Sequence, residues 1–535
     1  MEFDALQYQY PSKRNVIYGR RGMVATSQPL AAQAGLDILK KGGNAIDAAI
    51  ATAACLTVVE PTSNGIGSDA FAIVWSKGEI HGLNSSGPAP KSISIDILKA
   101  TGICTMPKYG WTPVTVPGAP GAWAELSERF GRLPLIEALK PAIEYASYGY
   151  PVSPGVSPTW NRAYKIYKEN LMEEDFQNWS EIFAPKSRAP QVGEMWSSKG
   201  HAETLASIGK TMAKSFYSGE IAQKIDFYSK KSGGFLRLED LEAFKPEWVT
   251  PIRVNYRGYD VWEIPPNGQG LVALIAFNIL KGFNFSVKDS SDTYHKQIEA
   301  IKLAFADGHK YITDPSYMKL NVKHLLSEEY AAERRSLITK EALIPGAGEP
   351  PKGGTVYLAT ADDEGNMVSY IQSNYMGFGS GIVIPDTGIS LQNRGHNFSL
   401  DPSHDNCLMP GKRTYHTIIP GFLSKDNKPI GPFGVMGGFM QPQGHLQVVM
   451  NAIDFNMNPQ EALDAPRFQW MKDKLVEVEH SFPQHIAQAL VRKGHVIKYT
   501  VDSSSFGRGQ IIWRNDNGVL CGGTEPRTDG TIAVW

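Results

Sequence analysis

The sequence predicts a protein of the α/β (α+β) class, in which helices and sheets are layered in one globular body. Segments with apolar residues at helical spacing occur along the same chain as segments with strand-like alternation. No repeat of solenoid length is present. Apolar residues make up 42% of the 535 residues and charged residues 20%, as in an ordinary soluble enzyme.

Two helices are predicted at 27–57, and a Gly-rich loop with short strands follows them. Ser27 is a suitable N-cap for the first helix, and Gly42 ends it after a pair of lysines. Asn44 can cap the second helix, whose many alanines suit close packing against a sheet. Another helix is predicted at 291–311, where apolar residues recur at helical spacing.

The C-terminal part of the chain is predicted to be rich in strands. Residues 330–354 are charged and then rich in Pro and Gly, which predicts a flexible linker. Residues 355–375 predict strand, tight turn, strand. An amphipathic helix is predicted around Leu446, and the sequence NDNG predicts the turn of a closing hairpin.

Composition and motifs argue against several classes of function. The 53 Lys and Arg residues balance 54 Asp and Glu residues, so no nucleic-acid or anionic membrane partner is expected. The most apolar segment, 45–59, is too short to span a bilayer and contains Asp47. Four scattered cysteines and a start unlike a signal peptide predict a cytoplasmic protein.

No motif for a metal or an organic cofactor is convincing. GIGSDA, residues 65–70, matches a loose dinucleotide fingerprint but follows a predicted helix instead of a strand. HExxH, the phosphate-binding P-loop and the GxSxG elbow do not occur in the sequence. We therefore predict neither a metal nor a cofactor.

The sequence GGT at 353–355 has two interpretations. In the simpler one, the glycines form a loop and Thr355 begins a hairpin. In the other, cleavage before Thr355 gives the threonine a free amine, which can act as the base for its own hydroxyl. Gly353 and Gly354 would permit the backbone geometry that such a cleavage needs. Gly437 and Gly438 likewise fit either a tight turn or a pair of N–H donors for an oxyanion.

Many segments in order resemble the γ-glutamyltransferases and the related cephalosporin acylases. They include KKGGNAIDAA, VTVPGAPGAW, IPPNGQG, EAIKLAFADGHKY, GGTVYLATADDEGNMVS, FGSGIV, PGKRTYHTIIP, GVMGGFMQPQGH and EPRTDG, and the resemblance runs from about Gly22 to the C-terminus. It implies an N-terminal-nucleophile hydrolase fold of four layers, αββα. It also implies self-cleavage between Gly354 and Thr355 into a large subunit, 1–354, and a small subunit, 355–535.

The resemblance also implies roles for individual residues. Thr355 would be the nucleophile and, through its amine, the base. Gly437 and Gly438 would bind the oxyanion, and Ser373 would orient the nucleophile. The acyl group would be released to water or to an amine acceptor. The expected partners are therefore a small amide substrate and that acceptor, while the sequence does not indicate an oligomeric state.

The chain departs from the family where γ-glutamyl groups are recognised. The family's carboxylate-binding arginine falls at or next to Ser86, and its acidic residue falls at Asn397. Its serine pair becomes His416 and Thr417, and Arg394 adds a positive charge. The resemblance thus predicts an amide hydrolase or acyltransferase for γ-glutamyl (glutathione-like) or related acyl amides, with these five residues binding substrate. The alternatives are an acylase for other amides, such as glutaryl amides, and an unprocessed, inactive binding homologue.

Overall fold

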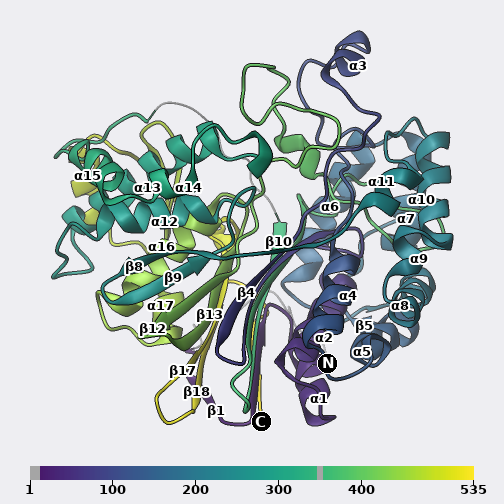
Figure 1. The fold of residues 1–535 in the computed structure, drawn as a ribbon, viewed down its shortest axis with the longest axis horizontal. Coiled ribbons are helices and arrows are strands. Elements are labelled where there is room, and N and C mark those ends of the chain that lie inside the picture. Colours follow the sequence, from purple (N-terminus) through teal and green to yellow (C-terminus); the bar gives the residue numbers. More distant parts are fainter. Residues whose placement is uncertain (1–12, 346–353) are drawn as a thin grey trace.

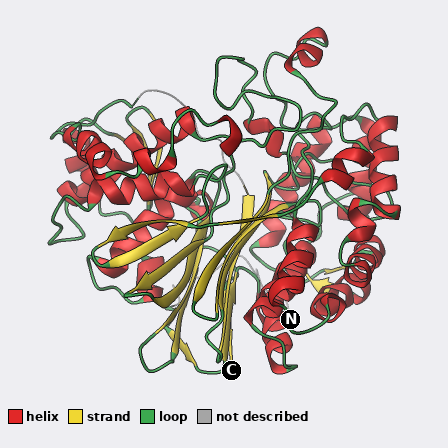
Figure 2. Cartoon of the chain, viewed as in Figure 1, coloured by secondary structure: helices red, strands yellow, loops and turns green. Residues whose placement is uncertain are grey.

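Two stacked antiparallel sheets form the centre of the molecule, and helices cover both outer faces (Figures 1 and 2). The computed structural model describes residues 13–345 and 354–535. The arrangement confirms the predicted mixed class and the four-layer fold. None of the helices in these two ranges is long and apolar enough to cross a membrane.

Thr355 lies in an inner strand of the first sheet. The order of this sheet is β19 (Thr531–Val534), β2 (Gly22–Thr26), β10 (Gly354–Asp362), β11 (Met367–Tyr375), β3 (Asp69–Ser76), β4 (Glu79–Ser85) and β7 (Glu247–Val249). Strands β10 and β11 are joined by a short polar turn, which confirms the predicted hairpin.

The second sheet carries Gly437 and Gly438 at the end of its central strand. Its order is β1 (Ile17–Gly19), β18 (Leu520–Thr524), β17 (Arg508–Arg514), β13 (Lys428–Met436), β12 (Gly421–Lys425), β9 (Tyr259–Glu263) and β8 (Ile252–Tyr256). Strands β17 and β18 form the closing hairpin predicted from NDNG.

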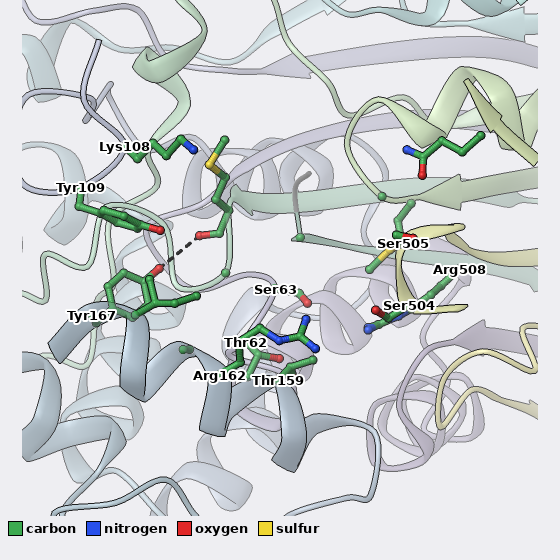
Figure 3. Close-up of a pocket in the computed structure, with 18 residues that line it drawn as sticks. Thr62, Ser63, Lys108, Tyr109, Thr159, Arg162, Tyr167, Ser504, Ser505 and Arg508 are labelled. Carbon is green, nitrogen blue, oxygen red and sulfur yellow. Dashed lines mark hydrogen bonds between the residues drawn. The ribbon is translucent and has the colours of Figure 1, made fainter. Parts of the chain in front are cut away.

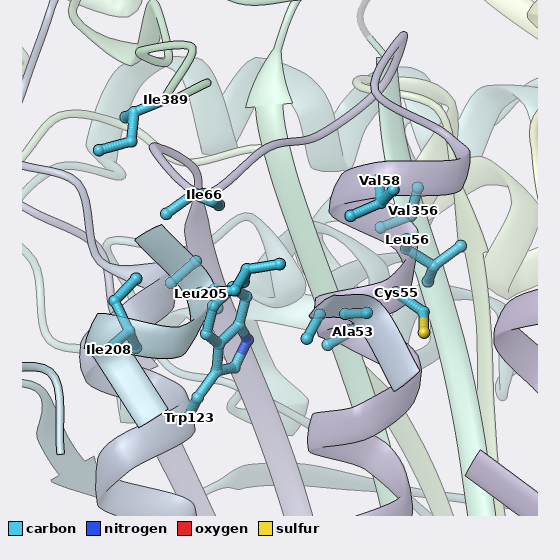
Figure 4. Packing of buried hydrophobic residues seen from close by; sticks show 14 of the residues in the cluster. Ala53, Cys55, Leu56, Val58, Ile66, Trp123, Leu205, Ile208, Val356 and Ile389 are labelled. Carbon is cyan, nitrogen blue, oxygen red and sulfur yellow. The ribbon is translucent and has the colours of Figure 1, made fainter. Parts of the chain in front are cut away.

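Side chains of β10 contribute alternately to two hydrophobic cores, because successive side chains of a strand point to opposite faces of the sheet. Val356 and Leu358 pack with the helices on the outer face. Figure 4 shows Val356 close to Val58 of α2 (Ala45–Val59). Tyr357 and Ala359 instead join the core between the two sheets.

The helices form two separate layers. The layer on the first sheet contains α1 (Pro29–Lys40), α2, α4 (Ala119–Phe130), α5 (Leu135–Tyr148), α6 (Val156–Asn170), α7 (Glu173–Phe183), α8 (Lys199–Thr211), α9 (Lys214–Tyr217), α10 (Glu220–Lys231) and α11 (Leu238–Ala243), with α3 (Ile95–Ala100) further out. The layer on the second sheet contains α12 (Gly270–Leu280), α13 (Ser291–Tyr311), α14 (Val322–Leu325), α15 (Glu328–Ser336), α16 (Met440–Ile453), α17 (Pro459–Asp464) and α18 (Gln484–Arg492).

Short elements complete the fold. They are the pair β5 (Tyr150–Pro151) and β6 (Met195–Trp196), a small sheet of β14 (Phe468–Lys472), β15 (Leu475–Glu479) and β16 (Val496–Thr500), and the 3-10 turns Pro315–Tyr317, Arg394–Asn397 and Ser503–Ser505.

Two local predictions need correction. The N-cap of α1 is Gln28 with Pro29 in the first turn, while the Ser27 hydroxyl bonds to the buried carboxylate of Glu60. The predicted linker begins inside helix α15, and residues 346–353 lie outside the described residues. Helix α16 (Met440–Ile453) confirms the helix predicted around Leu446, and Gly437 and Gly438 precede its first turn.

Candidate active site

A β-bulge in β11 lies opposite Thr355 at the start of β10. Gly354 pairs with Tyr375 and Val356 pairs with Gln372, so the register shifts across Thr355. The extra residue belongs to β11, where Ser373 and Asn374 stand opposite the single residue Thr355. Thr355 faces this bulge and is buried, with 1% exposure.

Ser373 connects the Thr355 hydroxyl to the carbonyl group before it. The Ser373 hydroxyl donates to the Gly354 carbonyl oxygen at 2.8 Å and accepts from the Tyr375 backbone N–H at 2.8 Å. The Thr355 and Ser373 hydroxyl oxygens are 3.1 Å apart. Because Ser373 has one proton and gives it to Gly354, Thr355 must be the donor in this contact.

Gly437 and Gly438 form a turn between β13 and α16. Their φ angles are +135° and +60°, in the region that favours glycine. The Gly437 carbonyl accepts from Met440 N–H at 3.1 Å, and the Gly438 carbonyl accepts from Gln269 Nε2 at 2.9 Å. Among the described residues, neither glycine N–H has an acceptor. Two free N–H groups before a helix are suited to binding a developing negative charge.

Gly354 and Gly437 line the same cavity, which has a volume of about 440 Å³ (Figure 3). Lys108, Arg162 and Arg508 also line it, and Tyr167 forms part of the opposite wall, with its hydroxyl bonded to the Met376 carbonyl at 3.3 Å. Thr355 itself does not line the cavity. In the uncut chain, Gly354 thus lies at the cavity wall next to the buried hydroxyl.

Arg394, His416 and Thr417 belong to a buried charged cluster around Asp69. Asp69 is paired across the sheet with Ser373, so the cluster lies next to the candidate nucleophile. His416 Nε2 is 2.9 Å from Asp69 Oδ2, and Arg394 Nη1 donates to Thr417 Oγ1 at 2.7 Å. These three predicted substrate-binding residues do not line the 440 Å³ cavity.

Burial dominates the protonation of this cluster. It raises the pKa of Asp69 to about 7, while Arg394 acts in the opposite direction. Burial also lowers the pKa of Arg394 to about 10 and holds the pKa of His416 well below its ordinary value. Arg394 stacks on the Tyr375 ring, 4.4 Å from its centroid, and its Nε and Nη2 have no hydrogen-bond acceptor among the described residues.

Ser86 and Asn397 border this cluster: Ser86 precedes Gly87, whose backbone N–H acts on Asp69, and Asn397 acts on Tyr375. The Ser86 hydroxyl bonds to Asn84 Oδ1 at 2.7 Å, and its carbonyl accepts from Arg413 Nε at 3.0 Å. Asn397 donates to the Tyr415 carbonyl at 3.0 Å and lines a second cavity of about 560 Å³. The structure therefore places the five predicted substrate-binding residues in or beside the cluster around Asp69, and none of them lines the 440 Å³ cavity.

Lys108, Arg162 and Arg508 carry no signal in the sequence. They are single cations far apart in the chain, and only the folded molecule brings them to one cavity. No local motif could have selected them, because their proximity depends on how α6, the loop that carries Lys108 and β17 of the second sheet come together in the fold.

One group of metal-ligand residue types is present within the described ranges. His295, Glu299 and His495 are buried together. His295 and His495 are hydrogen-bonded at 2.8 Å, and Lys302 Nζ donates to Glu299 at 2.7 Å. The ammonium of Lys302 already neutralises the carboxylate, so these residues are explained by hydrogen bonding and ion pairing. The prediction that the protein needs no metal stays a prediction.

The stacked sheets and helix layers, with a hydroxyl residue at the start of an inner strand, define the N-terminal-nucleophile hydrolase class of fold. The chain belongs to the Gamma-glutamyltranspeptidase family, whose model matches residues 31–535. This confirms the family resemblance and the prediction of an enzyme.

Individual relatives cover nearly all of the chain. A glutathione hydrolase-like proenzyme (YwrD) of Bacillus subtilis is 36% identical over 96% of this chain and 98% of its own. An oxamate amidohydrolase proenzyme of Klebsiella pneumoniae is 33% identical over 96% and 98%. The crystal structure of a cephalosporin acylase from Bacillus halodurans is 65% identical with a TM-score of 0.98, covering 100% of this chain and 99% of that one.

Proposed function

We propose that the chain cuts itself between Gly354 and Thr355 and then hydrolyses amides through an acyl-Thr355 intermediate. The observation that carries the proposal is the hydrogen-bonded path from the Thr355 hydroxyl through Ser373 to the Gly354 carbonyl. The relatives support it, because the curated ones are named as proenzymes of amide-cleaving enzymes.

Self-cleavage begins with attack of Thr355 Oγ1 on the Gly354 carbonyl carbon. The threonine proton passes to Ser373 while Ser373 passes its own proton to the carbonyl oxygen, so no net charge is created. As the adduct collapses, the proton on its hydroxyl oxygen passes to the Thr355 nitrogen, the carbonyl re-forms and the C–N bond breaks, which leaves an ester between Gly354 and the Thr355 oxygen. Water then hydrolyses the ester, which gives a carboxylate at Gly354 and a free amine at Thr355.

Turnover then uses the new amine as the base. The reference pKa of an α-amino group is roughly 7.7–8.0, so a modest shift makes it a proton acceptor near neutral pH. The N–H groups of Gly437 and Gly438 stabilise the oxyanion of the substrate. Water or an amine then releases the acyl group from Thr355, which makes the enzyme a hydrolase or an acyltransferase.

The fragments 1–354 and 355–535 remain one body after cleavage. In the first sheet, β10, β11 and β19 come from the small subunit and the other strands come from the large subunit. Separating the fragments would break strand pairs in both sheets and expose the core between them. The cut thus changes one bond and leaves the fold intact.

We further propose that the preferred acyl group is not γ-glutamyl. Arg394 is fully buried against Tyr375 and Thr417, outside the cavity, and Ser86 is bonded to its own neighbours. Losing charge-assisted contacts to a substrate costs about 1.5–3 kcal/mol each. An acylase for other amides is therefore favoured over a glutathione hydrolase.

Electrophoresis of freshly purified protein, with sequencing of the fragments, tests the processing. We expect two bands, the smaller beginning Thr-Val-Tyr. Thr355→Ala should remain uncut and inactive, while the matched variant Thr355→Ser keeps a hydroxyl and should still be cut. A single intact chain with amidase activity, or cleavage in Thr355→Ala, would contradict the proposal. An intact and inactive wild-type chain would favour the binding homologue.

A further inference from the structure

Gln269 contacts the turn that carries the predicted oxyanion donors. We propose that Gln269 is a positioning residue, which holds the turn at Gly437 and Gly438 in the geometry that turnover requires. This inference rests on the proposed function of Thr355 and of the two glycines. It assigns a role in turnover to a side chain of the large subunit, which acts through the turn and touches neither the substrate nor the reacting atoms.

Gln269 lies in the loop between β9 and α12, and its side chain is fully buried. It is the N-cap residue of α12, but its side chain makes no capping hydrogen bond to that helix. The backbone of the loop is bonded to the small subunit instead. The Gln269 N–H donates to the His416 carbonyl at 2.9 Å, and the His416 N–H donates to the Asn267 carbonyl at 2.9 Å. The Gln269 side chain therefore lies at the junction of the two proposed subunits.

The polar atoms of the Gln269 amide all have partners. Nε2 donates to the Gly438 carbonyl at 2.9 Å and to the Thr417 carbonyl. Oε1 accepts from the Tyr415 hydroxyl at 2.9 Å. Because carbonyl oxygens can only accept hydrogen bonds, the NH₂ group must face Gly438 and Thr417, so the amide has one suitable orientation. All three partners belong to the small subunit.

These contacts restrain both peptide planes that flank Gly438. The Gly437 carbonyl accepts from the Met440 N–H at 3.1 Å, which fixes the plane that contains the Gly438 N–H. The Gly438 carbonyl accepts from Gln269 and, at 3.2 Å, from the Gln441 N–H. A turn of two glycines can adopt many backbone conformations. Without the Gln269 amide, only the first turn of α16 would hold the two carbonyls.

The loss of Gln269 should affect turnover more than processing. Oxyanion stabilisation depends on donors that are fixed in advance, and a displacement of about 1 Å can cost about 10²-fold in rate. In the proposed mechanism, Gly437 and Gly438 donate during turnover, whereas Ser373 donates during self-cleavage. A variant of Gln269 should therefore have a lower kcat, with KM and the rate of processing almost unchanged. A general loss of stability would not separate these quantities.

The test compares processed wild type with Gln269→Met and Gln269→Glu, on whichever of the glutaryl and γ-glutamyl anilides the wild type cleaves faster. We expect kcat to fall about 10- to 100-fold, with KM changed less than about twofold. Electrophoresis over time should show the two fragments appearing at the wild-type rate.

Gln447→Met is the matched control. Gln447 is also buried, and its Nε2 donates to the carbonyls of Gln443 and Phe468 at 3.0 Å each. Its Oε1 accepts from the Phe468 N–H at 3.1 Å. The amide thus makes the same kinds of contact further along α16, away from the turn. Gln447→Met should lower Tm about as much as Gln269→Met and leave kcat unchanged.

Tyr415→Phe is a milder variant, because it removes only the hydroxyl that donates to the Gln269 amide. It should lower kcat about threefold, as the loss of one neutral hydrogen bond allows. Combined with Gln269→Met it should cause no further loss, since both changes act through one amide. If neither Gln269 variant folds, Tyr415→Phe decides alone, and an unchanged kcat would overturn the positioning role.

Three further results would overturn this role. They are wild-type kcat in folded Gln269 variants, a change confined to KM, and an equal loss of kcat in Gln447→Met. These results leave the proposed function standing, whereas processed wild type that cleaves neither anilide and no other amide would refute the function itself.

Discussion

At the scale of single residues, the hydroxyl of Ser373 has two partners that matter for different steps. It donates to the Gly354 carbonyl, which exists only as an amide before cleavage, and it contacts the Thr355 hydroxyl. The N–H groups of Gly437 and Gly438 have no acceptor among the residues that the structure describes. In the proposed mechanism, Ser373 would donate to the reacting carbonyl oxygen during self-cleavage, whereas Gly437 and Gly438 would donate to it during turnover.

Ser373→Ala should therefore slow processing more than turnover. Removing one hydrogen-bond donor to an oxyanion costs about 10²–10³ in rate. We expect a delay of this order in the appearance of the two fragments, followed over time by electrophoresis, and rescue by Ser373→Thr. In contrast, Gly437→Ala should be processed but turn over slowly, because its φ of +135° is strained for alanine. Equal effects of both substitutions on both steps would contradict this division.

At the scale of elements, buried residues of helix α13 form hydrogen bonds with Leu343, which precedes the proposed cleavage site in the chain. Glu299 of α13 accepts the Leu343 N–H at 2.9 Å, and Lys302 donates to the Leu343 carbonyl at 3.1 Å. The Ala342 N–H donates to the Lys493 carbonyl at 2.7 Å, in the small subunit of the proposed enzyme. The Glu299–Lys302 pair is thus a fixed attachment for the proposed end of the large subunit.

Lys302→Met should destabilise the fold strongly, because it leaves the fully buried Glu299 without its cation. Breaking such a pair costs about 3–5 kcal/mol, whereas replacing both partners costs less. Thermal unfolding should therefore give a lower Tm for Lys302→Met than for Lys302→Met with Glu299→Gln. A double variant with the lower Tm would show that the two groups are not coupled in this way.

The elements that could be predicted from the sequence are those with local signals. Helix α13 has the predicted bounds 291–311 because its caps and its apolar spacing are local. The cap of α1 was mispredicted because Ser27 is engaged by Glu60, a contact that depends on tertiary structure. The convergence of Arg162 and Arg508 depends on two distant elements, and the burial of Arg394 depends on Tyr375 and Asp69, so neither could be read from the sequence.

At the scale of the whole molecule, the fold buries charge where its two sheets meet. Asp69 on β3 faces Arg394 and His416, and Arg413 and the Gly87 backbone N–H also act on it. Its pKa rises from an ordinary 3.8 to about 7 on burial. The folded state therefore binds a proton that the unfolded state has lost, and stability falls as the pH rises from about 4 to about 7.

Asp69→Asn should remove this part of the pH dependence. His416 stays neutral over the range because its pKa is held well below its ordinary value. The difference in Tm between wild type and Asp69→Asn should thus shrink from pH 5 to pH 8, measured by thermal unfolding of both proteins in the same buffers. A difference that stays constant would mean that Asp69 does not titrate in this window.

The hydrogen bond between the Ser373 and Thr355 hydroxyls can also form with Ser373 as the donor. While the Ser373 hydroxyl donates to the Gly354 carbonyl oxygen, the Thr355 hydroxyl can only act as the donor to Ser373. After the proposed cut, the cleaved terminus can move off and free the serine proton to point at the threonine oxygen. The Thr355 hydroxyl would then donate its proton to the new amine. The departure of the Gly354 carbonyl would thus activate the Thr355 hydroxyl as a nucleophile.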